Sequence, residues 1–152
     1  MKKQIFLFTM LFFFLQHCGY SPIYSNIDNF KFNFNVIEIQ GNEDMNNLIL
    51  SQIKKYSNNS EAKTYDLKIQ TQYQKDILTK NKKGEATNFA IKTKIEFKIV
   101  NTNKDQIFSF EEEIKSTAIN NQYELKKYEN SIQNNFVKSK LDELILNLSI
   151  NK

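Results

Sequence analysis

The sequence has very few of the residues that most enzymes and metal sites use. Among its 152 residues there is one cysteine (Cys18) and one histidine (His17), and tryptophan and arginine are absent. A single cysteine allows no intramolecular disulfide. Catalysis by Ser-His-Asp or Cys-His groups, and zinc binding by nitrogen or sulfur ligands, need more histidine or cysteine than this. We therefore expect a protein that is not an enzyme and that holds no metal or cofactor.

The lack of arginine also bears on nucleic-acid binding. All 21 basic residues are lysines, against 17 acidic residues, and the net charge is only +4. Without arginine, the bidentate hydrogen bonds that read guanine edges are missing. So small a positive excess, spread over the chain, does not indicate a nucleic-acid partner.

The first eighteen residues have the pattern of an export signal. Lys2 and Lys3 precede the almost wholly apolar run Ile5–Leu15. This run is eleven residues long, whereas a membrane-spanning helix needs about 20. A basic start, a short apolar stretch and a cysteine after it predict a signal peptide over residues 1–17, whose removal leaves Cys18 first. Acyl chains on Cys18 would then anchor the protein to a membrane.

Two other interpretations of this start stay open: a plain secretory signal and an uncleaved inner-membrane anchor. His17 stands where lipoprotein processing normally requires a small residue. Acylation would block the only thiol, and cleavage before Cys18 would remove His17, which leaves a mature chain with neither imidazole nor free cysteine. Cleavage would also remove Lys2 and Lys3, which lowers the net charge from +4 to about +2.

After the signal the chain divides into a tether and one folded domain. The tether, residues 18–29, holds the only proline, and the domain spans residues 30–150. Apolar residues at every second position predict four strands, over residues 33–40, 65–78, 89–99 and 106–118. Turns are expected at 81–84 and 101–104, with Gly84 supplying the positive φ that a hairpin turn favours.

Apolar residues at helical spacing predict two helices. The first runs from about Glu43 to Tyr56 with Asn42 as its cap, and the second from Asn120 or Asn121 to about residue 148. The order is therefore β-α-β-β-β-α. Strands with one apolar face and helices with one apolar stripe predict an α+β fold: a single four-stranded, largely antiparallel sheet with both helices packed on one face.

Two short segments carry a resemblance to a known family. Cys18–Tyr24 (CGYSPIY) resembles the start of mature LPS-assembly lipoproteins of the LptE family, in which glycine, an aromatic residue and Pro-hydrophobic-Tyr follow the lipidated cysteine. Gly84–Asn88 (GEATN) is similar to the Gly-x-Ala-Thr turn of that family, although Asn88 stands where many relatives have a basic residue. The order of elements over residues 18–150 resembles the family as well.

The resemblance implies a non-enzymatic lipoprotein of the Gram-negative outer membrane, held on the periplasmic side by acyl chains such as palmitate on Cys18. Its partner would be the large β-barrel translocon LptD, in a 1:1 hetero-complex rather than a homo-oligomer. There it would plug the barrel, help the barrel to assemble, and assist lipopolysaccharide transport to the outer leaflet.

Lysines are concentrated where such a ligand could be bound. Lipopolysaccharide presents clustered phosphates and carboxylates, which lysines can meet as point charges. Residues 75–98 hold seven lysines against three acidic residues, a local net charge of +4. The candidate lipopolysaccharide-binding residues are three lysines at the hairpin turn and three on the polar face of the next strand: Lys80, Lys82, Lys83, Lys92, Lys94 and Lys98. The other interpretation is a solvated face that keeps the domain soluble.

Two other functions stay open. The chain could be a small envelope lipoprotein that scaffolds another outer-membrane or cell-wall complex. It could also be a carboxylate enzyme such as a glycosidase, which needs paired carboxylates about 5–9.5 Å apart in a cleft. A thin domain of one sheet and two helices offers no obvious deep cleft for such an enzyme. The acidic run Glu111-Glu112-Glu113 suits a metal site poorly, because strand alternation puts Glu112 on the opposite face from the other two. We interpret the run as solvated.

Overall fold

The computed structural model describes residues 32–56, 63–101, 104–119 and 121–150. The elements are β1 (Phe32–Gln40), α2 (Glu43–Tyr56), β2 (Lys63–Lys80), β3 (Ala86–Val100), β4 (Gln106–Thr117) and α3 (Gln122–Ile150). The predicted signal peptide, the tether and Cys18 lie outside the described residues. Within the described ranges, no helix has both the length and the apolar character needed to cross a membrane.

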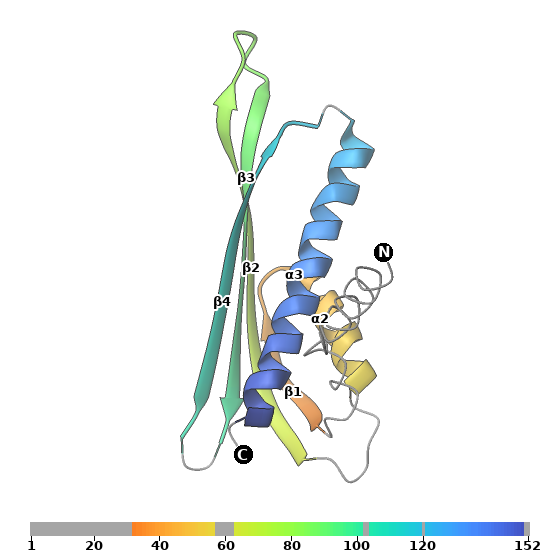
Figure 1. Cartoon of the computed structure of the whole chain (residues 1–152), viewed down its shortest axis with the longest axis vertical. Helices are drawn as coiled ribbons and strands as arrows, with labels where there is room; N and C mark the ends of the chain where they lie inside the picture. The colour runs from red at the N-terminus through yellow and green to blue at the C-terminus, as the bar shows by residue number, and fades with distance from the viewer. Residues whose placement is uncertain (1–31, 57–62, 102–103, 120, 151–152) are drawn as a thin grey trace, which may run out of the picture.

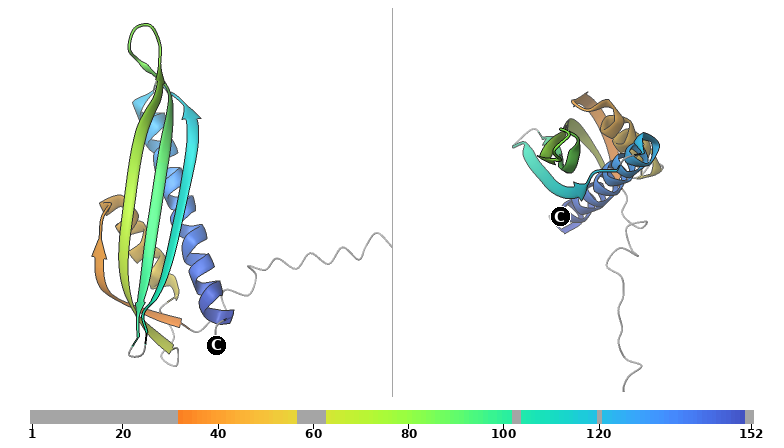
Figure 2. Two further views of the ribbon diagram at one scale, coloured as in Figure 1. Left: turned by 90° about the vertical axis from the view of Figure 1, so that its left-hand side faces the viewer. Right: turned by 90° about the horizontal axis from the view of Figure 1, so that it is seen from above.

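The four strands form one sheet in the order β1-β2-β3-β4 (Figure 1). β1 runs parallel to β2, because α2 carries the chain back across the sheet between them, and the other two neighbouring pairs are antiparallel. Both helices lie on the same face of the sheet, which leaves the other face open (Figure 2). The predicted α+β class, element order and largely antiparallel sheet are confirmed.

The core lies between the sheet and the two helices. On β2 the buried residues Leu67, Ile69 and Thr71 alternate with more exposed ones, as a strand with one covered face requires. The main cluster of buried side chains comprises Phe34, Met45, Ile49, Ile53, Leu67, Ile69, Ile95, Phe97, Ile99, Phe136, Val137, Leu141, Leu144, Ile145 and Leu148. A smaller cluster of Phe89, Ile91 and Ile132 continues toward the hairpin between β2 and β3.

Asparagine side chains cap both helices, as the sequence predicts. Asn42 Oδ1 accepts a hydrogen bond from the Met45 N–H at 3.0 Å. Asn121 Oδ1 accepts from the N–H groups of Tyr123 at 2.9 Å and Glu124 at 3.2 Å. These bonds satisfy donors that the first helical turn leaves unpaired. Of the two asparagines that the sequence offered for α3, Asn121 is the cap.

A close backbone contact joins the β1–α2 connection to β2. Gly41 has a φ of 106°, and a Cβ at this position would lie 1.9 Å from the carbonyl oxygen of Thr71. The Thr71 side chain is buried, and its hydroxyl donates to Asn46 Oδ1 at 2.7 Å. Glycine is required here because both the φ and the approach exclude a side chain. This contact fixes the start of α2 above β2.

The hairpin formed by β2 and β3 projects beyond the rest of the sheet (Figures 1 and 2). The last β3–β4 pair is Asn88 with Thr117, whereas β2 and β3 remain paired as far as Lys80 and Ala86. Irregular register on either side of Thr79 marks a bulge in this arm. At the turn Gly84 has a φ of 84°, which confirms its predicted conformation.

Candidate functional site: the hairpin tip and the open face of the sheet

The candidate lysines fall into two groups that do not form one patch. Lys80, Lys82 and Lys83 lie at the hairpin tip, and the other three lie along β3 on the open face. Lys92 and Lys98 are six residues apart on one strand, which corresponds to roughly 20 Å. The tip lies about as far again beyond Lys92. One small anionic group therefore cannot contact all six lysines.

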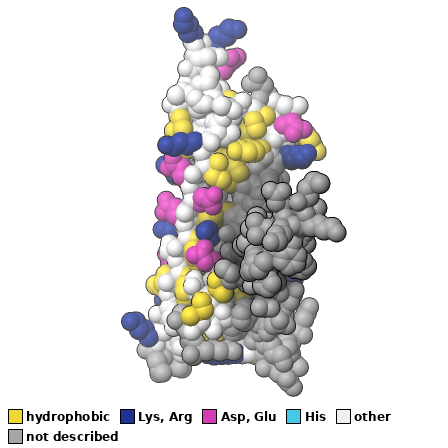
Figure 3. Space-filling view, in the orientation of Figure 1, with side chains coloured by type: hydrophobic (Ala, Val, Ile, Leu, Met, Phe, Trp, Pro, Cys, Tyr) yellow, Lys and Arg dark blue, Asp and Glu magenta, His cyan; other side chains and the backbone are white. Residues whose placement is uncertain are grey.

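The three tip lysines are exposed and carry uncompensated charge. In the part of the chain that the structure describes, none of them has a carboxylate oxygen within 4.0 Å of its Nζ. Dark blue side chains mark this end of the molecule in Figure 3. Because a free ammonium group gains most from an added anion, the tip is the more favourable place for a phosphate.

Asn81 explains why the nearby Glu85 does not neutralise the tip. The Asn81 Nδ2 group donates to Glu85 Oε2 at 2.6 Å. Its Oδ1 accepts from the N–H groups of Lys83 at 2.9 Å and Glu85 at 3.0 Å. An asparagine side chain that binds the backbone in this way stabilises the turn. The carboxylate is thus held against the turn by an amide.

Exposed aliphatic side chains lie on the same arm as the tip lysines. The side chains of Ile77 and Leu78 are 54% and 47% exposed. They precede Lys80 by only two or three residues, so the arm presents apolar surface next to positive charge. This combination suits an amphiphile with an anionic headgroup. The alternating pattern predicted a strand here but gave no sign that these two residues would lie outside the core.

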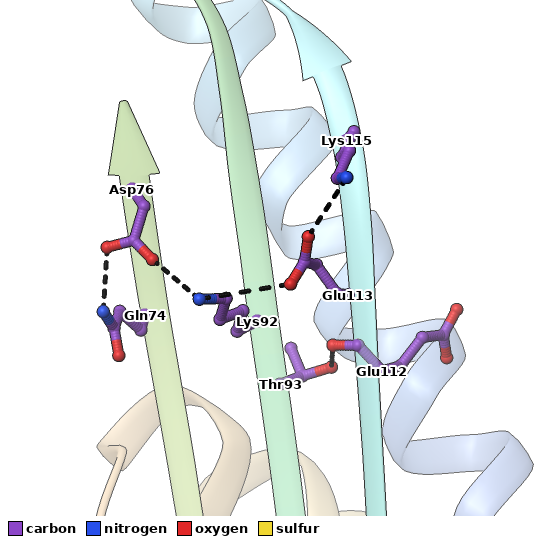
Figure 4. Close-up of polar contacts among 7 residues, drawn as sticks. All are labelled: Gln74, Asp76, Lys92, Thr93, Glu112, Glu113 and Lys115. Carbon is purple, nitrogen blue, oxygen red and sulfur yellow. Dashed lines mark hydrogen bonds and ion pairs between the residues drawn. The ribbon is translucent and has the colours of Figure 1, made fainter. Parts of the chain in front are cut away.

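The lysines on the open face are largely paired with carboxylates. Lys92 Nζ lies 3.1 Å from Asp76 Oδ2 and 4.0 Å from Glu113 Oε2 (Figure 4). The hydrogen bond and charge of Asp76 raise the pKa of Lys92. The pKa of Asp76 is lowered by hydrogen bonds from Gln74 and then from Lys92. Lys92 thus bridges β2 and β4 across β3.

Lys98 is paired with a carboxylate, whereas Lys94 is not. Lys98 Nζ lies 2.8 Å from Asp105 Oδ2, and this hydrogen bond raises the pKa of Lys98 and lowers that of Asp105. Lys94 stands opposite Gln72 and Glu111 in the register. It has no ion pair within 4.0 Å among the described residues. Sequence reasoning placed these lysines on the polar face correctly but missed their partners, which come from neighbouring strands for Lys92 and from the β3–β4 connection for Lys98.

The acidic run on β4 is divided between the two faces of the sheet. Glu111 and Glu113 stand opposite Lys94 and Lys92, whereas Glu112 stands opposite the buried Thr93. Figure 4 shows the Glu112 side chain directed away from the other acidic groups. This confirms the predicted alternation. Within the described residues no group of three or more Asp, Glu, His or Cys side chains could hold a metal ion.

Two hollows lie on the described surface, and only the smaller one includes a candidate lysine, Lys98. A shallow groove of about 640 Å³ between α2 and α3 includes Asp44, Lys126 and Gln133, and a smaller hollow of about 140 Å³ on the open face includes Lys68 and Glu96. Gln133 is 2% exposed, and its Oε1 has no hydrogen-bond partner. The helical stripe did not indicate a buried glutamine, because its neighbour Ile132 already fits the apolar spacing. The carboxylates of β4 line neither hollow.

Comparison with known proteins relates the chain to lipoproteins by fold. No protein-family model and no curated protein matches its sequence. The crystal structure of rare lipoprotein B from Shewanella oneidensis superposes with a TM-score of 0.53 at 11% identity, covering 77% of this chain and 98% of that one. The solution structure of an uncharacterised lipoprotein B from Nitrosomonas europaea gives a TM-score of 0.49 at 15% identity, covering 79% of this chain and 86% of that one. The chain therefore shares its fold with rare lipoprotein B.

Proposed function

We propose that this protein is an outer-membrane lipoprotein of the LptE kind, anchored on the periplasmic side by acyl chains on Cys18. It plugs the LptD barrel in a 1:1 complex, helps the barrel to assemble, and assists lipopolysaccharide transport to the outer leaflet. The carrying observation is the fold shared with rare lipoprotein B over 98% of that chain. The first eighteen residues, which have the pattern of a lipoprotein signal, support the same proposal.

The anchor and tether fit residence at a membrane surface. Each buried methylene of an acyl chain contributes about 0.8 kcal/mol, so two or more chains on Cys18 give stable attachment. Residues 19–31 separate this cysteine from β1, and thirteen residues reach at most about 45 Å when extended. An acylated Cys18 would thus hold the folded domain close to the membrane.

The open face of the sheet suits the polar interior of a barrel. Lys68 pairs with Glu38 at 2.7 Å, and Lys92 and Lys98 are paired with carboxylates as described above. A surface whose charges are mostly compensated can lie against a polar lumen wall at little electrostatic cost.

The hairpin tip is the part of the candidate set that we assign to lipopolysaccharide. Lys80, Lys82 and Lys83 would bind phosphates, and Ile77 and Leu78 would contact the first methylenes of the acyl chains. Lys92 and Lys98 are less suited, because an added phosphate would have to compete with carboxylates at 3.1 Å and 2.8 Å. Lys94 stays a candidate within this proposal.

The first test is purification of the tagged, full-length protein from its own membranes, with intact-mass analysis. We expect a large β-barrel protein in 1:1 ratio and a bait mass that includes acyl chains on a chain starting at Cys18. Acylated bait with no barrel would contradict the translocon assignment and favour a scaffold of another envelope complex. Bait that keeps its first seventeen residues would contradict the lipoprotein assignment.

The tip is tested separately by removing its charge. Replacing Lys80, Lys82 and Lys83 by glutamine should weaken lipopolysaccharide binding by about tenfold, since three exposed ion pairs of about 0.5 kcal/mol each are lost. The matched control replaces three exposed lysines elsewhere that have no ion pair among the described residues: Lys54, Lys104 and Lys138. Equal affinity of the two triple variants, both melting like wild type, would contradict a role for the tip.

A further inference from the structure

β4 is a long and regular edge of the sheet. Its twelve residues pair with β3 over the whole length of the strand without any register irregularity, and β4 stands last in the strand order (Figure 1). The opposite edge, β1, has nine residues and a register shift between Val36 and Glu38. Short, bulged edges resist pairing with another chain, whereas long regular ones invite it. Only β4 has the regular kind of edge.

The direction of the β4 backbone groups follows from two hydrogen bonds. The Ala118 N–H donates to the Thr87 carbonyl at 2.8 Å in continuation of the β3–β4 register. The Glu112 carbonyl also faces β3, where it accepts from the Thr93 hydroxyl at 3.4 Å. Because hydrogen-bonded and non-hydrogen-bonded pairs alternate along an antiparallel ladder, the even-numbered residues of β4 bond to β3. The odd-numbered residues direct their N–H and C=O groups outward.

Five consecutive outward residues are therefore available for pairing: Ile107, Ser109, Glu111, Glu113 and Lys115. All five have exposed side chains, which lie on the open face of the sheet. Together they span about 27 Å, the length of a typical edge-to-edge strand contact or more. Ile107 adds an apolar side chain that is 60% exposed.

The charge on this strand indicates what kind of segment pairs with it. Glu111, Glu112 and Glu113 lie at the centre of β4, so a second copy in antiparallel pairing would bring glutamates opposite glutamates. Like charges directly opposite one another destabilise a strand pair. Among the described residues Glu111 and Glu112 have no lysine within 4.0 Å, whereas Glu113 lies 4.0 Å from Lys92 and 3.7 Å from Lys115. A segment with lysine or arginine at its centre would instead place positive charges opposite the glutamates on both faces of the sheet.

We propose that the β4 edge is a docking site for an extended, basic segment of the barrel partner, which adds as a fifth strand beside β4. The inference rests on the proposed function, because the partner is the barrel proposed there. The segment belongs to a terminus or loop of that partner, since the strands of a closed barrel have both edges paired already. Main-chain hydrogen bonds supply affinity, and the three glutamates select a basic sequence.

The experiment places a photoreactive phenylalanine analogue at Ser109, Glu113 or Lys115 of the full-length protein in its own membranes. The cross-linked peptides are then sequenced by mass spectrometry. Strand addition predicts that a step of four residues on β4, from 109 to 113, moves the cross-link by about four residues along one lysine- or arginine-rich segment. Cross-links that scatter over the partner, or none from β4, would overturn the proposal.

A proline variant tests the main-chain bonds themselves. Ser109→Pro removes an N–H that bonds to nothing within the sheet, so the fold should tolerate it, as edges tolerate proline. Ser109→Ala is the control, because it removes the same hydroxyl but keeps the N–H. We expect at least a tenfold lower cross-link yield from position 115 in the proline variant only. Equal yields from the two variants would overturn strand addition. If the proline variant does not fold, the register of the cross-links from the unmutated strand tests strand addition instead.

The outcomes separate this inference from the proposed function. If the barrel co-purifies but the β4 positions give scattered cross-links or none, strand docking is wrong and the plug proposal stands. If an ordered set of cross-links lies on a protein other than a barrel, the edge is a docking site but the translocon assignment is wrong.

Discussion

Gly41 is the residue whose identity the fold constrains most. Its φ of 106° lies in the left-handed region, and a Cβ would collide with the Thr71 carbonyl at 1.9 Å. Gly84 has a similar φ of 84° but nothing within 4 Å of its Cβ position. The two glycines therefore differ in packing but share a left-handed φ that a residue with a Cβ rarely adopts, and they form a matched pair.

Alanine at each glycine separates strain from collision. Gly84→Ala should cost about 1–2 kcal/mol, the price of the left-handed conformation for a residue with a Cβ. Gly41→Ala should cost about 2 kcal/mol more, because the connection to α2 must move away from Thr71. Thermal unfolding would show a drop of about 5 °C for the first and at least 10 °C for the second. Equal melting temperatures would mean that this contact is looser than the structure shows.

Individual residues also show where sequence reasoning stops. The caps Asn42 and Asn121 were predictable, because a cap and the N–H groups it binds are within three residues of one another. The pairing of Lys92 with Asp76 and Glu113 was not, because those residues are 16 and 21 positions away and meet only through the register of three strands. The candidate lysines could be found from composition, but which of them lack an ion pair within the described residues depends on that register.

At the scale of the elements, the open face of the sheet makes stability depend on pH. Hydrogen bonds from lysines lower the pKa of Glu38 and of Asp105 from their ordinary values of 4.5 and 3.8. The pKa of Asp76 is lowered by Gln74 and Lys92. A carboxyl group with a lower pKa in the folded state contributes stability above its unfolded pKa, and this contribution is lost as the pH falls through the folded value.

We therefore expect the urea midpoint to fall as the pH decreases from 4.5 toward 2, and to fall less in 1 M salt. An Asp76→Asn, Asp105→Asn double variant should be less stable than wild type at pH 6 and should lose less on acidification. The control double variant, Glu43→Gln with Glu124→Gln, changes exposed carboxylates that have no ion pair among the described residues. If both variants followed the wild-type acid profile, the cross-strand pairs would contribute nothing measurable.

The β4 edge leads to a second prediction at this scale. The three central glutamates that favour a basic partner also prevent two copies from pairing through β4. Replacing Glu111, Glu112 and Glu113 by glutamine should allow dimers to form at micromolar concentration, detected by light scattering after size-exclusion chromatography. Adding Ser109→Pro to the triple variant should restore the monomer. A triple variant that stays monomeric would show that the glutamates are not what prevents pairing through this edge.

For the molecule as a whole, element order and the location of the core could be predicted because both follow from alternation and helical spacing. The projecting arm could not. Its residues continue the strand pattern of β2, yet Ile77 is 54% exposed although its partner Phe89 on β3 is buried. In the structure β1 pairs with β2 only as far as Gln70, and β4 ends at Thr117, so the neighbouring strands stop before the hairpin turn. The protein is thus a packed domain with one unsupported hairpin.

This division predicts that the arm can be shortened without unfolding the domain. Residues Thr79–Thr87 contribute nothing to either buried cluster, so replacing them by an Asn-Gly turn should change the melting temperature by no more than about 5 °C. Lipopolysaccharide binding should fall at least as far as in the lysine-to-glutamine triple variant, which keeps the arm at full length. A larger loss in the shortened protein would show that the length and shape of the arm act together with its charge. Wild-type binding by a shortened protein that melts normally would place the ligand elsewhere on the domain.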